Sequence, residues 1–99
     1  MPRSYVYILK CSDGTYYTGS TRCLQERIRQ HQAGEAANYT RKRGPVELVY
    51  YEVFDRIDDA FEREKQIQGW RREKKEALVN GDLDQLPGLG KRRVKGRRH

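Results

Sequence analysis

Two ionisable side chains, Arg27 and His31, lie on the apolar face of a helix that the sequence predicts over residues 22–33. Leu24, Ile28 and His31 are spaced at i, i+4 and i+7, and Arg27 comes three residues after Leu24. A guanidinium beside an imidazole suits chemistry on an anionic group, because the first binds charge and the second exchanges protons near neutral pH. The structural alternative is an arginine that extends to solvent next to a hydrogen-bonded core histidine.

Glu64 is a carboxylate within an apolar line on a second predicted helix. The apolar members of that line are Ile57, Ala60 and Ile67. The neighbouring charged residues are predicted to point elsewhere: Glu62, Arg63 and Lys65. Burying an unpaired carboxylate costs several kcal/mol, so a cation should meet Glu64. Arg27 and a divalent metal ion are the two candidates.

Capping residues predict where these helices begin and end. Ser20 or Thr21 can offer a hydroxyl to the free amides of the first helix, and Gly34 can end it. Asp59 followed by Glu62 matches a capping box, which predicts that the second helix starts at Ala60 and runs to about residue 69.

Tyr7 and Tyr17 belong to two short strands joined by a turn at Ser12-Asp13-Gly14. If the loop has three residues with Gly14 at a positive φ, Tyr7 is opposite Gly19 and Leu9 is opposite Tyr17. The two tyrosines then share one face of the hairpin. A two-residue loop would place Tyr16 on the face of Tyr7 instead, because a shift of one residue inverts every side chain.

The remaining segments supply a third strand, a basic loop and a C-terminal helix. Residues 46–54 carry the strongest strand signal and are predicted to form the central strand. The loop before them interleaves an aromatic ring with three cations, which suits backbone phosphates but also fits a solvated charge run; its candidate nucleic-acid-binding residues are Tyr39, Arg41, Lys42 and Arg43. A last helix over 71–79 should bury Trp70 with Ala77 and Leu78.

Composition predicts one folded domain over residues 1–80 and a basic tail over 81–99 that we expect to be disordered in isolation. The net charge is +7, but residues 91–99 contain six Lys or Arg and no acid. No run reaches the roughly 18 apolar residues of a membrane helix, and the N-terminus lacks an apolar signal core, so we expect a cytoplasmic protein without membrane contacts. Its two cysteines are expected to be reduced, and a zinc site is improbable.

Together these residues resemble the GIY-YIG nuclease domain, and within it the small stand-alone UPF0213 or YhbQ-like proteins. The resemblance spans about residues 5–79. Its parts are Tyr5-Val6-Tyr7, Tyr17-Thr18-Gly19, Leu24 to Arg27 followed by His31, Tyr39-Thr40-Arg41, and Ala60 to Glu64. This chain has Tyr5-Val6 where the family pattern has Gly-Ile, and Thr18 where the pattern has Ile. A site asparagine of the larger relatives has no clear counterpart.

The resemblance implies an α+β fold with a small three-stranded antiparallel sheet flanked by helices. It also implies a metal-dependent endonuclease that hydrolyses phosphodiester bonds in DNA, directed by structure rather than sequence. Tyr7, Tyr17, Arg27, His31 and Glu64 would be catalytic, with Glu64 holding one Mg²⁺ or Mn²⁺ ion. The general base stays open between Tyr7 and His31, because a tyrosine at its reference pKa near 10 needs nearby cations to act at neutral pH.

Two other functions remain. One is a non-catalytic module that binds DNA or structured RNA, which the missing asparagine counterpart favours. The other is a protein-interaction domain, which leaves Arg27, His31 and Glu64 on packed faces unexplained. The sequence does not indicate an oligomeric state.

Overall fold

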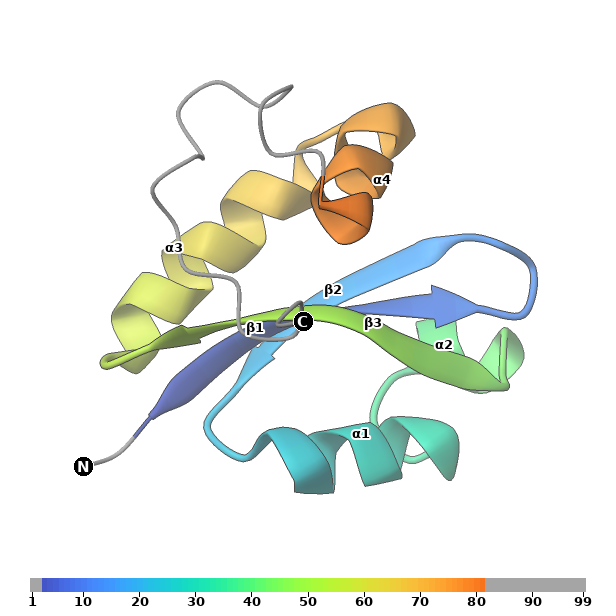
Figure 1. Cartoon of the computed structure of the whole chain (residues 1–99). Coiled ribbons are helices and arrows are strands. Elements are labelled where there is room, and N and C mark those ends of the chain that lie inside the picture. Colours follow the sequence, from blue (N-terminus) through green and yellow to red (C-terminus); the bar gives the residue numbers. More distant parts are fainter. Residues whose placement is uncertain (1–2, 82–99) are drawn as a thin grey trace.

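The computed structural model describes residues 3–81, which form a three-stranded antiparallel sheet between two layers of helices (Figure 1). The elements are β1 (Ser4–Cys11), β2 (Tyr16–Thr21), α1 (Leu24–Gln32), α2 (Asn38–Lys42), β3 (Val46–Phe54), α3 (Ile57–Gln68) and α4 (Arg72–Asn80). α1 and α2 lie on one face of the sheet, and α3 and α4 lie on the other. The predicted fold class is confirmed. Within the described residues, no helix is long and apolar enough to cross a membrane.

The β1–β2 hairpin has the register of the three-residue loop. Tyr7 pairs with Gly19, and Leu9 pairs with Tyr17. Gly14 has a φ of 86°, which a glycine adopts without steric cost. Tyr7 and Tyr17 therefore lie on the same face of the sheet, as one of the two predicted registers requires.

β1 is the central strand, so the prediction that residues 46–54 occupy the centre is wrong. Four consecutive residues of β1 are at most 2% exposed: Val6, Tyr7, Ile8 and Leu9. Consecutive burial shows that helices cover both faces of this strand. β3 has the stronger β-propensity, but propensity measures fit to a half-buried sheet surface and does not distinguish a central strand from an edge strand.

α1 begins at Leu24, two residues later than predicted, and no side chain caps it. The hydroxyl of Thr21 accepts a hydrogen bond of 3.1 Å from the Cys23 amide, just outside the helix. The hydroxyl of Ser20 donates to Glu64 instead. Gly34 follows the helix with a φ of 77°, so its predicted role as a helix stop is confirmed.

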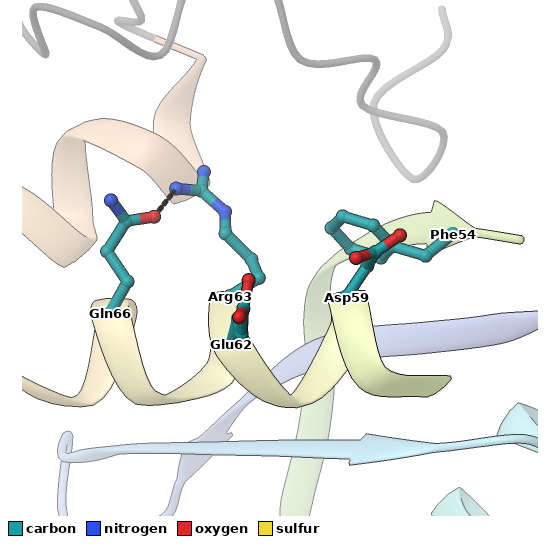
Figure 2. Close-up of a pocket in the computed structure, with 5 residues that line it drawn as sticks. All are labelled: Phe54, Asp59, Glu62, Arg63 and Gln66. Carbon is teal, nitrogen blue, oxygen red and sulfur yellow. Dashed lines mark hydrogen bonds between the residues drawn. The ribbon is translucent and has the colours of Figure 1, made fainter. Parts of the chain in front are cut away.

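α3 begins at Ile57, three residues before the predicted start, and the Asp59 capping box does not form. Its buried positions are Ala60, Arg63 and Ile67. The prediction that Arg63 points away from the apolar line is therefore wrong. Figure 2 shows Arg63 donating to Gln66, and its other nitrogens donate to Glu52 at 2.8 and 2.9 Å.

Arg63 is tolerated in the core because its charge is fully paired. Its side chain is 4% exposed and that of Glu52 is 1% exposed, and Tyr50 donates a further hydrogen bond to the same carboxylate. A buried charge without such partners would be strongly destabilising. Trp70 packs against the adjacent core cluster with Leu78, and the guanidinium of Arg63 lies 5.3 Å from its ring centroid.

α4 ends at Asn80, where Gly81 has a φ of 87°. The predicted basic tail lies beyond Gly81, outside the described residues, so the proposed boundary between domain and tail stays a prediction.

Candidate active site

A buried hydrogen bond joins Tyr7 of β1 to His31 of α1. The Tyr7 hydroxyl oxygen is 2.8 Å from Nε2 of His31, and each residue is 2% exposed. The histidine stands near the end of α1, on the helix face that packs against the sheet. The polar residue on this apolar stripe thus meets a polar residue of the sheet.

Thr40 of α2 determines which nitrogen of His31 carries the proton. Its hydroxyl has a single hydrogen, which it donates to the Ala37 carbonyl at 3.2 Å. The same oxygen lies 2.8 Å from Nδ1 of His31, and because its hydrogen goes to the carbonyl we assign this contact as donation from a protonated Nδ1. Nε2 is then the acceptor, and Tyr7 is the donor. Sequence analysis did not identify Thr40 as a site residue, because it appeared only within the Tyr39-Thr40-Arg41 part of the resemblance.

Burial and Arg27 shape the titration of this pair. Burial, aided by the positive charge of Arg27, lowers the pKa of His31 to about 4. Burial also raises the pKa of Tyr7 above its usual range; the neighbouring Tyr17 and the charge of Glu64 raise it further, and Arg27 partly opposes them. The nearby cation therefore does not make Tyr7 an easily ionised base. At neutral pH the pair is a neutral phenol that donates to a neutral imidazole.

Tyr17 and Arg27 border the Tyr7–His31 pair. The ring of Tyr17 lies 5.0 Å from that of His31 and 6.4 Å from that of Tyr7, measured between centroids. Arg27 is half-buried and donates to the side chain of Gln30 at 3.2 Å. The ring contacts bring Tyr7, Tyr17 and His31 together, and the charge of Arg27 lowers the pKa of each of the three.

Gly19 provides the space for the Tyr7 hydroxyl. A Cβ atom at this position would lie 2.4 Å from the Tyr7 oxygen and 3.2 Å from a ring carbon of Tyr17. No side chain fits at such distances without displacing the tyrosine. Since β2 is an edge strand, the buried Tyr7 hydroxyl lies against the outermost strand of the sheet.

Glu64 reaches the same edge from α3, on the opposite face. Ser20 donates to one of its oxygens at 2.5 Å, and Gln68 donates to the other at 2.8 Å. Gln68 also donates to the Thr18 carbonyl at 3.2 Å, which ties the carboxylate to β2. The negative charge of Glu64 raises the pKa of Tyr17 and that of Tyr7, so it acts across the edge strand.

The predicted pairing of Glu64 with Arg27 does not occur in the described part of the chain, where neutral donors hold the carboxylate. A half-buried carboxylate without a cation suits a divalent metal ion. Residues 3–81 contain no cluster of three or more His, Cys, Asp or Glu side chains that could hold a metal by themselves. A single carboxylate still fits Mg²⁺, which keeps several waters and binds substrate phosphate oxygens. Ser20 and Gln68 would then orient the metal ligand.

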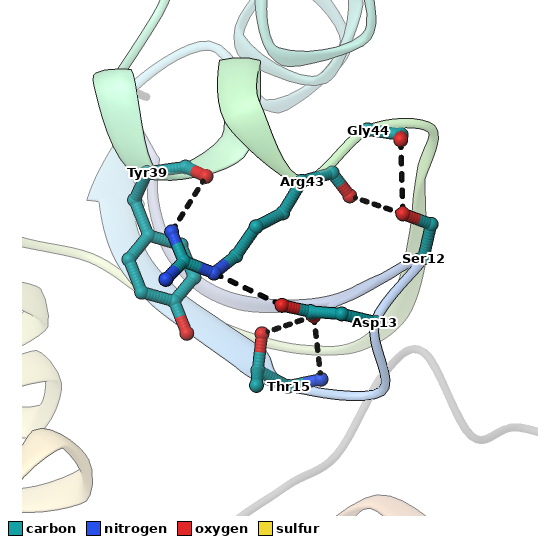
Figure 3. Close-up of polar contacts among 6 residues, drawn as sticks. All are labelled: Ser12, Asp13, Thr15, Tyr39, Arg43 and Gly44. Atoms are coloured by element: carbon teal, nitrogen blue, oxygen red, sulfur yellow. Dashed lines mark hydrogen bonds and ion pairs between the residues drawn. The ribbon is translucent and has the colours of Figure 1, made fainter.

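The basic loop is divided between structural and exposed cations. Figure 3 shows Arg43 donating to Asp13 at 3.0 Å and to the Tyr39 carbonyl at 3.4 Å. Its guanidinium also covers the Tyr39 ring at 4.0 Å, so Arg43 fastens α2 to the hairpin turn. Arg41 and Lys42 are exposed and keep their charges available. Tyr39 connects this loop to the site, because its ring centroid lies 5.8 Å from that of Tyr17.

A hollow of about 560 Å³ lies away from this cluster, beside α3 (Figure 2). Its lining residues are Phe54, Asp59, Glu62, Arg63 and Gln66. Two exposed carboxylates on its rim would repel a phosphate, and its one cation, Arg63, is committed to Glu52. None of the predicted site residues lines it.

Comparison with known proteins shows the family. The sequence model of the GIY-YIG catalytic domain matches residues 3–77. A UPF0213 protein of Haloquadratum walsbyi is 49% identical over 80 residues, covering 81% of this chain and 90% of the relative. A UPF0213 protein of Staphylococcus saprophyticus is 44% identical over 80 residues, covering 81% of this chain and 98% of the relative.

Two solved structures are similar to this chain in both sequence and fold. The solution NMR structure of a UPF0213 protein from Bacillus halodurans is 44% identical, with a TM-score of 0.52, and the match covers 79% of this chain and 83% of that one. A second NMR structure, of an E. faecalis protein, is 30% identical with a TM-score of 0.56, covering 83% and 88% of the two chains. The chain therefore belongs to the GIY-YIG nuclease family and is similar to its UPF0213 members.

Proposed function

We propose that this protein is a metal-dependent endonuclease that hydrolyses phosphodiester bonds in DNA. The observation that carries the proposal is the oriented hydrogen bond from Tyr7 to His31, set beside Arg27 and within the field of Glu64. A structural histidine needs only satisfied hydrogen bonds. Here its acceptor nitrogen faces a phenol that lies against the edge strand β2 and that is influenced by the charges of both Arg27 and Glu64.

The proton path follows from the hydrogen-bond directions. The Tyr7 oxygen donates its proton to Nε2 of His31 and keeps lone pairs for a water molecule. As that water attacks phosphorus, its proton passes to the Tyr7 oxygen, and the phenolic proton passes to Nε2. The imidazole becomes an imidazolium, and Tyr7 remains a neutral phenol. This relay does not require an ionised tyrosine, which the raised pKa of Tyr7 disfavours. It does require an imidazolium at His31, whose lowered pKa disfavours the charge in the free protein, so the relay depends on the negative charge of the bound phosphate to stabilise it.

Arg27 would stabilise the negative charge that builds up on the phosphate oxygens. Glu64 would hold one Mg²⁺ or Mn²⁺ ion, which supplies Lewis-acid polarisation of the phosphate and offsets charge on the leaving oxygen. Ser20 and Gln68 would keep the Glu64 carboxylate at the edge of β2 while the substrate binds.

Nucleic acid is the substrate that the surrounding charges favour. Arg41 and Lys42 are exposed on α2, whose Tyr39 adjoins the Tyr17 ring. These cations suit the phosphate backbone, which carries no sequence information by itself. We therefore propose recognition by shape and backbone, with DNA as the main substrate class and RNA as a further possibility.

The test is a cleavage assay on branched and single-stranded DNA with Mg²⁺ or Mn²⁺. Glu64→Gln and Arg27→Ala should each reduce the rate by at least about 100-fold, the usual cost of removing a preorganised charge partner of a transition state. Glu62→Gln and Arg29→Ala are matched controls, because both residues are exposed on the same two helices. Cleavage that survives Glu64→Gln would refute the metal proposal. DNA binding without any product would instead indicate a non-catalytic nucleic-acid-binding module.

A further inference from the structure

A second hollow, of about 190 Å³, opens where the β1–β2 hairpin meets α4 and α2. Its lining residues are Thr15, Tyr16, Tyr39, Arg72 and Lys75. They come from three separate elements, so the fold rather than a local run of sequence brings them together. Only Tyr39 among them is a predicted site residue.

The lining combines aromatic rings with cations and contains no carboxylate. The guanidinium of Arg72 lies 5.8 Å from the Tyr16 ring centroid. Aromatic faces that stack on bases, next to cations that bind phosphates, are the two components of single-strand nucleic-acid sites. Arg72 also donates to Glu76 at 3.0 Å, but both side chains are at least 40% exposed, and an exposed pair of this kind is weak enough to exchange for a phosphate.

The hollow is connected to the candidate active site by neighbouring aromatic rings. Tyr39 lies 5.8 Å from Tyr17, and Tyr17 lies 5.0 Å from His31, between ring centroids. Along β2, Tyr16 stands at the hollow and Ser20 stands at the Glu64 carboxylate. Four residues of extended strand span about 13 Å, which corresponds to a few nucleotides of one strand.

We propose that this hollow is a nucleotide subsite that holds an unpaired base on Tyr16 and its flanking phosphates on Arg72 and Lys75, with Tyr39, whose ring Arg43 covers, as part of the wall. It rests on the proposed function in taking the substrate to be nucleic acid. The subsite shares Tyr39 with the series of rings that leads to His31, and it would position a strand along the edge of β2 toward Tyr7 and Glu64. An unpaired base is required because a base within a duplex is stacked and cannot lie on a tyrosine ring.

The experiment measures binding of a fluorescent single-stranded DNA to the full chain without divalent metal, at several salt concentrations. The double variant Arg72→Gln/Lys75→Gln should lower the slope of log affinity against log salt by about 1.4, because each phosphate contact on a single strand contributes about 0.7. The matched control is Arg71→Gln/Lys74→Gln, which makes the same change of charge at the N-cap and in the first turn of α4 but in a hollow beside Trp70. The control should keep the parent slope.

A second pair of variants tests the stacking. Tyr16→Leu should weaken binding roughly 5- to 150-fold if the base lies on this ring, whereas Tyr16→Phe keeps the ring and should bind like the parent. Loss of affinity in Tyr16→Leu together with parent-like affinity in Tyr16→Phe supports the subsite. Parent-like affinity in Tyr16→Leu overturns it.

Equal salt slopes for the two double variants, or no measurable binding by the parent, also overturn the subsite. These outcomes are separate from the cleavage assay. If the protein cleaves DNA but the two double variants have equal salt slopes, the proposed function is supported and the subsite is refuted. If the salt slopes differ but no cleavage is found, the subsite is supported and the proposed nuclease activity is refuted.

Discussion

Burial of a neutral His31 should make the protein less stable as the pH falls below 6.5. The pKa of this histidine is lowered from 6.5 to about 4 in the folded protein, mainly by burial. Between these values the unfolded chain binds a proton that the folded chain refuses, so the free energy of unfolding decreases as the pH falls. One pKa unit corresponds to about 1.36 kcal/mol, which gives a total loss of roughly 3 kcal/mol.

Most of that loss falls where the carboxylates are still ionised. From the two pKa values, roughly 2 kcal/mol should disappear between pH 7.5 and pH 5. Carboxylates with lowered pKa values contribute to the same trend mainly at lower pH; for Asp13, hydrogen bonds from Thr15 hold the pKa below its ordinary 3.8. The window from pH 7.5 to pH 5 therefore isolates the histidine.

The assay is urea unfolding of the full chain at several pH values within this window. His31→Gln is the control, because it removes the titrating group and leaves His99 in both proteins. The parent should lose about 2 kcal/mol relative to this variant. If the free energy of unfolding depends on pH in the same way in both proteins, His31 is not held neutral. That result would also refute the inference that Tyr7 donates its hydrogen bond to His31.

Two further substitutions test the geometry around this pair. Gly19→Ala should lower the cleavage rate at least about 100-fold, because its Cβ would displace the Tyr7 hydroxyl. Gly69→Ala is the control and should keep the parent rate, since its Cβ would meet nothing closer than 3.6 Å. Equal rates for the two variants would refute the close approach of Gly19 to Tyr7. Thr40→Val should destabilise the protein by about 1–3 kcal/mol, because it leaves Nδ1–H of His31 buried without a partner, while Thr40→Ser should retain the bond. Nitrogen chemical shifts of the imidazole report the tautomer directly, and an unchanged tautomer in Thr40→Val would contradict the assignment to Thr40.

Much of the candidate active site could be predicted from the sequence, because its residues interrupt apolar patterns. His31 stands at i+7 on an apolar helical stripe, and the Ser12-Asp13-Gly14 turn supplies the glycine that a three-residue loop needs. A buried polar side chain needs a hydrogen-bond partner, so a partner for His31 could be expected from the sequence. The pattern itself does not identify that partner, so Tyr7 and Thr40 as the two partners of His31 required the structure.

Arg63 illustrates what sequence periodicity cannot decide. It comes three residues after Ala60 and four before Ile67, so it fits the buried stripe as well as Glu64 does. The deciding factor is Glu52, which lies on β3 and pairs with Arg63 across elements. A nonlocal partner of this kind leaves no signal in the spacing of α3 alone. The helix starts were misplaced for a related reason, because neither α1 nor α3 uses a side-chain cap.

The strand order explains how Tyr7 and Glu64 can act on one phosphate although they approach from opposite faces of the sheet. Tyr7 points toward α1, and Glu64 comes from α3. Through a central strand, two such groups would be separated by a full layer of backbone and side chains. Because β2 is an edge strand and Gly19 has no side chain, the Tyr7 hydroxyl lies against β2 from one face, while Ser20 of the same strand holds the Glu64 carboxylate on the other face. The need for a glycine at position 19 follows from the β1–β2 register, which places this residue opposite Tyr7.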